Sequence, residues 1–386
     1  MEFAERLNIP PSATLEINAL AMAKKKKGER VFNLSAGEPM VDTPQVIVDA
    51  AVQAMKEGKT HYTPVPGILE LRDAASRWMN TTYGSDFSAA ETFVTNGGKF
   101  ACYALCQVLL DPGDEALIIT PYWVSYPSMI ELAGARSVFI KTAQADGWKV
   151  SPAALEQAIT EKTRFVFFNN GSNPTGVLYS RDEVDAILRV CATKNIIVIS
   201  DEVYSGLTYD GQRYVSCASF PQYRDNVIVV HSASKNFGMT GWRVGLVFGA
   251  EDVIKKLSTL QGQSTSNTSS ISQWAAVAAY DHSEEIIPKI NQSMLYRRNA
   301  FVSTFSALFG TAIASPRSAI YCFLSLQVFG IEEIDSVAFC TRVLDQANVA
   351  LVPGAAFGAE GYVRCSFGVD EKEIGEALTT LHNFLF

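Results

Sequence analysis

The 386-residue sequence is poor in metal-binding side chains and in long apolar runs. It has only four histidines, and no two stand at a spacing typical of a metal site, so no metal is expected. Its seven cysteines are odd in number and include no C-x-x-C pair, which favours buried, reduced thiols over disulfides. No apolar run approaches the roughly 20 residues of a membrane helix, and the N-terminus lacks the apolar core of a signal peptide. These absences predict a cytoplasmic protein with no membrane partner.

Excess positive charge is also missing. The net charge is −8, which argues against nucleic acid as a partner, because nucleic-acid binding needs a basic face. The one basic block, Lys24 to Lys27, is interpreted as a solvated helix end. Hydrophobic residues make up 48% of the chain and charged residues 19%, which is typical of a globular protein with a large core. At roughly 100–200 residues per domain, the length predicts two or three domains.

Short apolar strands alternate with helices through the middle of the chain. The alternation predicts an α/β fold with a largely parallel sheet that is covered on both faces. Ser180 is a plausible N-cap for one of the helices. The expected strands are 91–95, 115–120, 164–170, 196–200, 226–231 and 244–249, and the expected helices are 99–110, 126–134 and 181–194.

The pattern changes after about residue 280, where a second domain is expected. A long helix at 284–309 precedes a strand-like segment at 320–327 and a helix at 332–347. Further strand-like segments at 349–353 and 362–367 lead to a final helix, so this part is predicted to be a smaller α+β domain. The first 40 residues lack a core of their own and are expected to dock there as an N-terminal arm. The predicted division is therefore 41–283 for the large domain, and 1–40 with 284–386 for the small one.

Polar residues follow five of the predicted strands. In parallel α/β sheets, ligands bind in the crevice outside the carboxyl ends of the strands, so these residues are expected to converge on one site. They are Gly97, Gly98, Trp123, Asn173, Asp201, Tyr204, and the run from Ser232 to Lys235.

The segment SASKNFGMTGWRVG (232–245) places Lys235 between two serines and Arg243. In a crevice near a second cation, the pKa of a lysine falls, and the neutral amine becomes a nucleophile toward aldehydes and ketones. The serines, Arg243 and the bare backbone of Gly97 and Gly98 are suited to a phosphate. Pyridoxal phosphate carries both an aldehyde and a phosphate. The alternative is an ordinary phosphate-loop lysine.

The neighbouring strand ends fit the same ligand. A carboxylate at Asp201 could pair with a protonated pyridine nitrogen and make the ring an electron sink, although it could also cap a helix. Tyr204 and Asn173 could donate to the phenolic oxygen of the cofactor. Trp123 could lie over the ring face, or be a buried structural tryptophan.

Six motifs together resemble the class I aminotransferases, which are fold type I pyridoxal-phosphate enzymes. In chain order they read HYTPVPG, PYWVSYP, NPTG, SDEVY, SASKNFGMTGWRVG and YVRCSFG. The resemblance covers nearly the whole chain and implies a large domain with a mostly parallel seven-stranded sheet plus a smaller α+β domain. One departure is visible, because Gly171 and Ser172 precede Asn173 where many family members have other residues.

The resemblance implies a role for each motif residue. Lys235 would bind the cofactor covalently and later move a proton between Cα and the cofactor, while Asp201 would hold the pyridine nitrogen. Asn173 and Tyr204 would hold the ring oxygen. Cofactor contacts are also expected from Gly97, Gly98, Lys99, Trp123, Ser232, Ser234 and Arg243.

Tyr62 matches a tyrosine that the partner subunit donates to the phosphate, so the resemblance implies a homodimer with shared active sites. Arg364 matches the arginine that binds the substrate α-carboxylate, helped by the backbone of Gly37, and Trp123 and Asn173 would also face the substrate. The peptide bonds Thr120–Pro121 and Asn173–Pro174 are candidates for the cis form.

The segments PSAT, GGK, PYWVSYP and QSTS resemble a prokaryotic-type aspartate aminotransferase subgroup. In it, Lys99 would face the distal carboxylate of aspartate or glutamate, and Thr14 would close over the substrate. The alternative is that Lys99 points to solvent. We therefore expect ping-pong amino transfer from L-aspartate to 2-oxoglutarate. Prephenate or aromatic substrates remain open, as does a pyridoxal-phosphate C–S lyase. A non-catalytic regulator of this family would carry an added DNA-binding domain. We do not expect one, because the family pattern already begins near residue 11.

Overall fold

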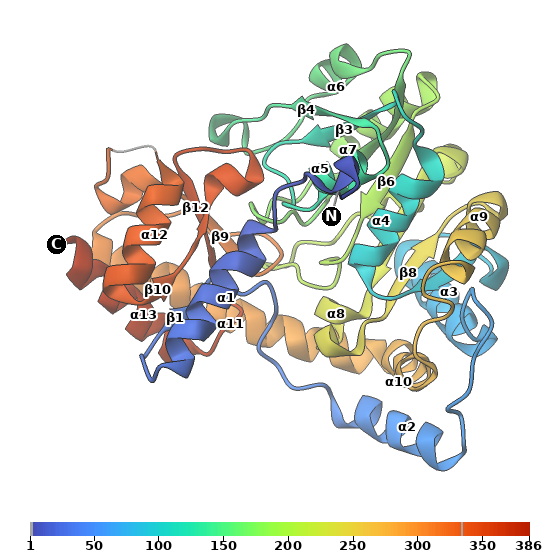
Figure 1. The fold of residues 1–386 in the computed structure, drawn as a ribbon, viewed down its shortest axis with the longest axis horizontal. Coiled ribbons are helices and arrows are strands. Elements are labelled where there is room, and N and C mark those ends of the chain that lie inside the picture. Colours follow the sequence, from blue (N-terminus) through green and yellow to red (C-terminus); the bar gives the residue numbers. More distant parts are fainter. Residues whose placement is uncertain (1–2, 333–334) are drawn as a thin grey trace.

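The computed structural model describes residues 3–332 and 335–386, and its centre is one sheet of seven strands (Figure 1). Neighbouring strands are parallel, except that β8 is antiparallel to both of its neighbours, β2 and β7. The largely parallel sheet is thus confirmed. Across the sheet the order is β2 (Thr92–Thr95), β8 (Gly245–Phe248), β7 (Val227–Ser232), β6 (Ile197–Asp201), β5 (Thr163–Phe168), β3 (Glu115–Ile119) and β4 (Arg136–Ile140).

Six of these strands lie within two residues of their predicted positions, whereas β4 was not predicted. It is an edge strand that pairs only with β3, and its residues are largely open to solvent, with Phe139 46% exposed. Because an edge strand need not be apolar on both faces, RSVFI lacks the continuous apolar run that marks the central strands.

Side chains of the central strands point alternately into two cores, one on each face of the sheet. In β5, Phe165 and Phe167 join one core, while Val166 and Phe168 join the other. The first core is covered by α4 (Gly98–Leu109), α5 (Tyr126–Leu132) and α9 (Glu251–Gly262). The second is covered by α2 (Gln45–Lys56), α3 (Leu69–Tyr83), α6 (Pro152–Ala158), α7 (Arg181–Thr193) and α10 (Ser270–Asp281).

The remaining elements build a second, smaller α+β region, as predicted. Its three-stranded antiparallel sheet has the order β11 (Val352–Pro353), β12 (Tyr362–Ser366) and β9 (Tyr321–Ser325). Around it lie α12 (Ser336–Ala347) and α13 (Glu371–Leu385); the predicted helix 332–347 includes residues 333–334, which lie outside the described residues. The 27-residue helix α11 (Ser283–Phe309) contacts α8 (Ala233–Asn236) and α13, and so joins the two regions (Figure 1).

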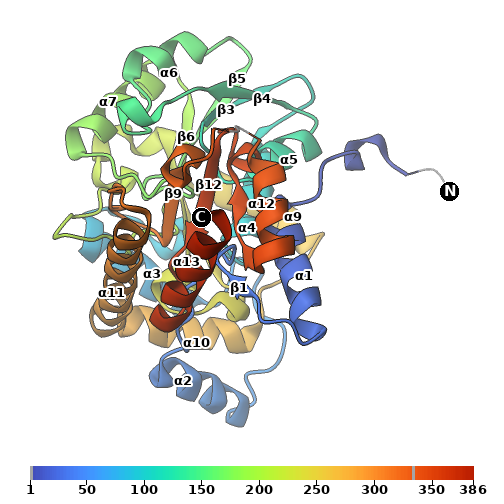
Figure 2. The ribbon, with the colours of Figure 1, turned by 90° about the vertical axis from the view of Figure 1, so that its left-hand side faces the viewer.

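The N-terminal segment packs on this smaller region. Strand β1 (Phe32–Asn33) pairs in parallel with β10 (Val349–Ala350), and Ala21 of α1 (Ala13–Lys26) is buried against Leu344. Ahead of α1, the segment with the short 3-10 helix Glu5–Leu7 extends away from the rest of the chain (Figure 2). Other 3-10 helices are Ala89–Glu91, Gln144–Asp146, Cys217–Ser219, Pro221–Asn226, Thr240–Trp242, Leu326–Phe329 and Gly354–Phe357.

The cysteines are buried and unpaired, in agreement with the sequence analysis. Cys102 and Cys106 both lie on the inner face of α4. Within residues 3–332 and 335–386, none of the helices is both long and apolar enough to cross a membrane.

Helix α7 begins with a capping box, as the predicted N-cap suggested. The Ser180 hydroxyl accepts from the Glu183 backbone N–H, and the Glu183 carboxylate accepts from the Ser180 backbone N–H. We expect Ser180→Ala to lower the free energy of unfolding by about 1 kcal/mol, measured by urea denaturation. The exposed Ser303→Ala on α11 is the control, expected to change it by less than about 0.5 kcal/mol. Equal losses in the two variants would contradict the capping role.

Candidate active site

The carboxyl ends of the large sheet and the smaller region enclose a cavity of about 480 Å³. It is lined by twelve of the fourteen residues predicted for the site. These are Gly37, Gly98, Lys99, Trp123, Asn173, Asp201, Tyr204, Ser232, Ser234, Lys235, Arg243 and Arg364.

Lys235 projects into the cavity from α8, the short helix that follows β7. Its Nζ donates to the carbonyl of Gly37, a residue of the N-terminal segment. Burial lowers the pKa of Lys235 to about 8, with smaller contributions from Arg364 and Arg243, while Glu38 opposes the change. The amine is therefore far more often neutral near pH 7 than a lysine in water, as a nucleophile or proton acceptor requires.

One corner of the cavity is built to accept an anion. The Ser232 hydroxyl lies 3.0 Å from the Ser234 hydroxyl, and Arg243 lies beside them with its backbone in the left-handed region at φ 57°. Helix α4 begins at Gly98, so its first N–H groups and the positive end of its dipole face this corner. Gly97 does not line the cavity, but a Cβ on it would lie 2.3 Å from Arg243 Nη2, so only glycine leaves room for the guanidinium.

Asp201 ends β6 and is 6% exposed. Its Oδ2 accepts from the Tyr126 hydroxyl at 2.6 Å, and its Oδ1 accepts from the Val203 N–H at 3.3 Å. Burial raises the pKa of Asp201, and the two hydrogen bonds oppose this change only in part. Sequence reasoning missed Tyr126, the second tyrosine of PYWVSYP, which stacks on Phe167 with ring centroids 4.1 Å apart. A buried carboxylate of this kind is suited to pairing with a cationic ligand atom.

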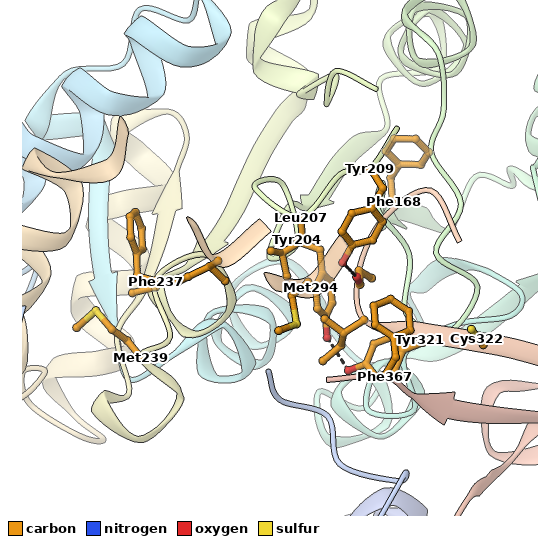
Figure 3. Close-up of a cluster of buried hydrophobic side chains, with 14 of the residues drawn as sticks. Phe168, Tyr204, Leu207, Tyr209, Phe237, Met239, Met294, Tyr321, Cys322 and Phe367 are labelled. Carbon is orange, nitrogen blue, oxygen red and sulfur yellow. Dashed lines mark hydrogen bonds between the residues drawn. The ribbon is translucent and has the colours of Figure 1, made fainter. Parts of the chain in front are cut away.

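Two tyrosines meet on the side of the smaller region. The Tyr204 and Tyr321 hydroxyls lie 2.7 Å apart, and Figure 3 shows the two side chains approaching each other from opposite directions. Tyr321 was also missed, although its strand was predicted. Both hydroxyls line the cavity, and one of the pair can donate to a ligand oxygen while it accepts from the other.

Arg364 of β12 is 2% exposed, which makes it a buried guanidinium. Nη1 donates to Asn173 Oδ1 at 3.0 Å and Nη2 to the Ser35 carbonyl at 2.7 Å, while Tyr321 and Phe357 lie over the guanidinium faces. Its Nε has no hydrogen-bond partner among the described residues. A buried donor without a partner costs free energy, which a bound carboxylate would recover.

Lys99 lies on the first turn of α4 and faces the cavity rather than solvent alone. Its Nζ is 5.2 Å from the centre of the Trp123 ring, a cation–π contact. Burial lowers the pKa of Lys99, and nearby Arg243 lowers it further. Thr14 also lines the cavity, together with Leu15 and Asn18 of the same helix.

Tyr62 lies apart from the cavity and is 92% exposed. Both predicted cis peptide bonds, Thr120–Pro121 and Asn173–Pro174, are present.

The sequence analysis missed three further residues that line the cavity, Asn169, Thr240 and Glu38. Asn169 donates to the Asp201 carbonyl at 2.8 Å and accepts from the Asn173 N–H at 2.9 Å, which joins two strand ends. The Thr240 hydroxyl donates to the Glu38 carboxylate at 2.6 Å. These are common polar residues in loops, and no spacing rule marks them. The charged side chains that line the cavity are Lys99, Lys235, Arg243 and Arg364 against Glu38 and Asp201, so cations outnumber carboxylates and the cavity favours an anionic ligand.

The burial of Asp201 predicts a cost in stability. Its folded-state pKa is raised above the value of about 3.9 in an unfolded chain, so the unfolded chain ionises first as the pH rises. Asp201→Asn has no charge, but it has only one oxygen for the two donors that the carboxylate serves, the Tyr126 hydroxyl and the Val203 N–H. We therefore expect the free energy of unfolding of the variant, relative to that of the parent, to be higher near pH 8 than near pH 3, because only the parent ionises a buried carboxyl group at this position between these pH values.

Urea denaturation at both pH values measures the difference. If the difference in free energy of unfolding between Asp201→Asn and the parent were the same at both pH values, the folded-state pKa of Asp201 would not be raised.

The family model and the similar proteins of known sequence point to the same family, the aminotransferases. The model of the family described as aminotransferase class I and II matches residues 29–381. The aspartate aminotransferase of Geobacillus stearothermophilus is 39% identical over 391 residues, which cover 100% of this chain and 99% of that protein. The aspartate/prephenate aminotransferase of Thermus thermophilus is 35% identical, with 95% of this chain and 94% of that protein covered.

Solved structures agree. The aspartate aminotransferase from Thermus thermophilus with maleate has a TM-score of 0.94 and 34% identity, with 99% of each chain covered. That from Rhizobium meliloti has a TM-score of 0.94 and 33% identity, with 100% of this chain and 99% of that chain covered. The fold and the resemblance expected from the six motifs are therefore confirmed, and the chain belongs to the class I and II aminotransferases.

Proposed function

We propose that this aminotransferase uses pyridoxal phosphate to transfer the amino group of L-aspartate to 2-oxoglutarate, giving oxaloacetate and L-glutamate. One observation carries the proposal. A lysine of lowered pKa, a buried carboxylate and a buried guanidinium with a free N–H, namely Lys235, Asp201 and Arg364, line the same cavity. The named activities of the relatives from Geobacillus and Thermus support the same substrates.

The residues of the cavity fit pyridoxal phosphate. Ser232, Ser234, Arg243 and the N-terminus of α4 form the anion corner, which suits the phosphate. The buried Asp201 would hold the pyridine nitrogen, with Tyr126 keeping the carboxylate in place. When bound, the cofactor supplies an aldehyde that reacts with amines and a ring that withdraws electrons from the substrate Cα.

The substrate would be held by its two carboxylates. Arg364 would present its planar guanidinium to the α-carboxylate, a geometry that suits arginine better than lysine. Lys99 would face the distal carboxylate, since it lines the same cavity as Arg364 and is the cation beside Trp123. With both ends fixed, Lys235 Nζ can take the proton from Cα and return one to the cofactor side, as a general base of moderate pKa can.

Prephenate is the second candidate substrate. Leu15 and Trp123 line the cavity beside Lys99, so apolar surface is available next to the cation that would bind a carboxylate. The Thermus relative is named for both aspartate and prephenate. A C–S lyase would share Lys235 and Arg364 but release pyruvate and ammonia from a sulfur amino acid without needing a 2-oxo acid.

We further propose a cytoplasmic homodimer in which Tyr62 completes the partner's cavity. The supporting observations are the exposure of Tyr62 and the exposed Phe3 and Leu7 on the projecting N-terminal segment. Large and small domains would correspond to 41–283 and to 1–40 with 284–386, with α11 beginning at the boundary.

We expect Lys235→Ala to lower kcat by about a thousandfold or more, because no other amine replaces the general base at this position. The substitution should leave the fold intact, as circular dichroism and gel filtration would show. Lys235→Arg is the matched control, since it keeps the positive charge but cannot be deprotonated; it should be equally inactive. Near-normal turnover in either variant, measured as glutamate formed from aspartate and 2-oxoglutarate, would refute the role of Lys235.

We expect Lys99→Gln to lower kcat/KM for L-aspartate by about 30-fold or more while changing it much less for a neutral amino acid such as leucine. The reason is that only the dicarboxylic substrate has a group for the Lys99 ammonium to bind. Lys141→Gln, on an exposed lysine outside the cavity, is the control and should change neither value. Equal losses on aspartate and leucine in Lys99→Gln would remove Lys99 from substrate selection.

A further inference from the structure

Asn236 follows Lys235 in α8 but does not line the cavity, and its side chain belongs to a buried polar cluster. Its Oδ1 accepts from the Gly206 N–H at 3.1 Å. Its Nδ2 donates to the Ser205 hydroxyl at 3.1 Å and approaches His231 Nε2 at 2.9 Å. Asn236 and His231 are each 0% exposed, so every one of these contacts is shielded from water.

The directions of these hydrogen bonds follow from donor chemistry. A backbone N–H can only donate, so the amide oxygen of Asn236 must face Gly206 and its NH₂ must face His231. Nε2 of His231 is then an acceptor, and a neutral ring carries its proton on Nδ1, which lies 2.8 Å from the Tyr280 hydroxyl. A second proton on Nε2 would oppose the amide NH₂, and burial lowers the pKa of His231 to about 3. The ring is therefore neutral.

This cluster joins two segments that both serve the cavity. Asn236 belongs to the helix of Lys235, and Ser205 and Gly206 directly follow Tyr204. The Asn236 side chain packs tightly against Gly206, because a Cβ on Gly206 would lie 3.0 Å from Asn236 Oδ1. Aromatic rings surround the cluster. The ring centroid of Trp78 lies 4.7 Å from that of His231, and the ring centroid of Phe237, which is labelled in Figure 3, lies 5.0 Å from that of Tyr280.

We propose that Asn236 is a positioning residue, whose amide fixes Lys235 relative to Tyr204 and holds His231 as the neutral, Nδ1-protonated ring behind the cavity. The expected effect on turnover rests on the proposed function. The expected pKa of Lys235 and the expected tautomer of His231 do not depend on it. A misplacement of a reacting group by about 1 Å can lower a rate about a hundredfold, so rigid support of Lys235 has a direct consequence for catalysis.

The first test compares Asn236→Ala with a matched asparagine, Asn291→Ala. Asn291 of α11 also ties the same turn, because its Nδ2 donates to the carbonyls of Gly206 and Thr208 at 3.0 and 2.8 Å, but it does not contact α8 through these bonds. The ligand-free protein is labelled with an amine reagent over a range of pH, and modification of Lys235 is followed by peptide mass spectrometry. Urea denaturation and turnover are measured alongside.

Asn236→Ala opens space behind Lys235 and should raise its pKa toward the ordinary value, by about half a unit or more, with kcat lowered about 10- to 100-fold. Asn291→Ala should lose similar stability but keep the pKa of Lys235 and keep kcat within about twofold. If both variants changed labelling and turnover alike, in proportion to their stability, Asn236 would be merely structural and the proposal would be overturned.

The second test reads the ring of His231 directly, by NMR of protein labelled with ¹⁵N-histidine. The chain has only four histidines, so the buried one can be assigned with a His231→Gln variant. The parent protein should show an Nδ1-protonated ring that does not titrate between about pH 5 and 8. Asn236→Asp, which replaces the NH₂ by an oxygen, should move a proton onto Nε2. An Nε2-protonated or titrating His231 in the parent protein would overturn the proposal.

The labelling of Lys235 and the NMR of His231 both use the ligand-free protein. If aspartate proved not to be a substrate while labelling and NMR gave the expected results, the proposed function would fail and the positioning role of Asn236 would stand.

Discussion

The desolvation of charge in the cavity between the large sheet and the smaller region is the constraint on which the rest of this structure depends. Lys235, Asp201 and Arg364 line one cavity. Burial lowers the pKa of Lys235 and raises the pKa of Asp201, and Arg364 is a buried guanidinium. An isolated buried charge is costly, so each is supported by fixed neighbours: Gly37 for Lys235, Tyr126 for Asp201, and Asn173 with Ser35 for Arg364.

The fold brings these groups together because parallel strands end at a common edge. Three adjacent strands contribute to the site. Asp201 ends β6, Ser232 ends β7 directly before the helix of Lys235, and Asn173 lies in the loop after β5. The smaller region supplies the opposite wall, with Tyr321 and Arg364 from β9 and β12 and Gly37 from the N-terminal segment.

The parts of this arrangement that could be predicted are those for which a short stretch of sequence is sufficient evidence. Apolar strands such as IIVIS, the Ser180 cap and the lysine among serines each carry a local signal, and the structure has them where expected. The missed features depend on tertiary context. Strand β4 is an exposed edge, and Tyr126, Tyr321 and Asn169 are ordinary residues that matter only because the fold sets them against Asp201, Tyr204 and Asn173. The aromatic and amide support of a site is therefore harder to predict than its charged centre.

The most direct test of the account is one half of the reaction, observed alone. The protein loaded with pyridoxal phosphate is mixed with L-aspartate and no 2-oxo acid, and absorbance and released oxaloacetate are followed together. The account predicts that the visible band of the bound cofactor is lost and that about one oxaloacetate is released per active site, after which 2-oxoglutarate restores the band. A band that aspartate leaves unchanged, or continued release of product without any 2-oxo acid, would contradict it.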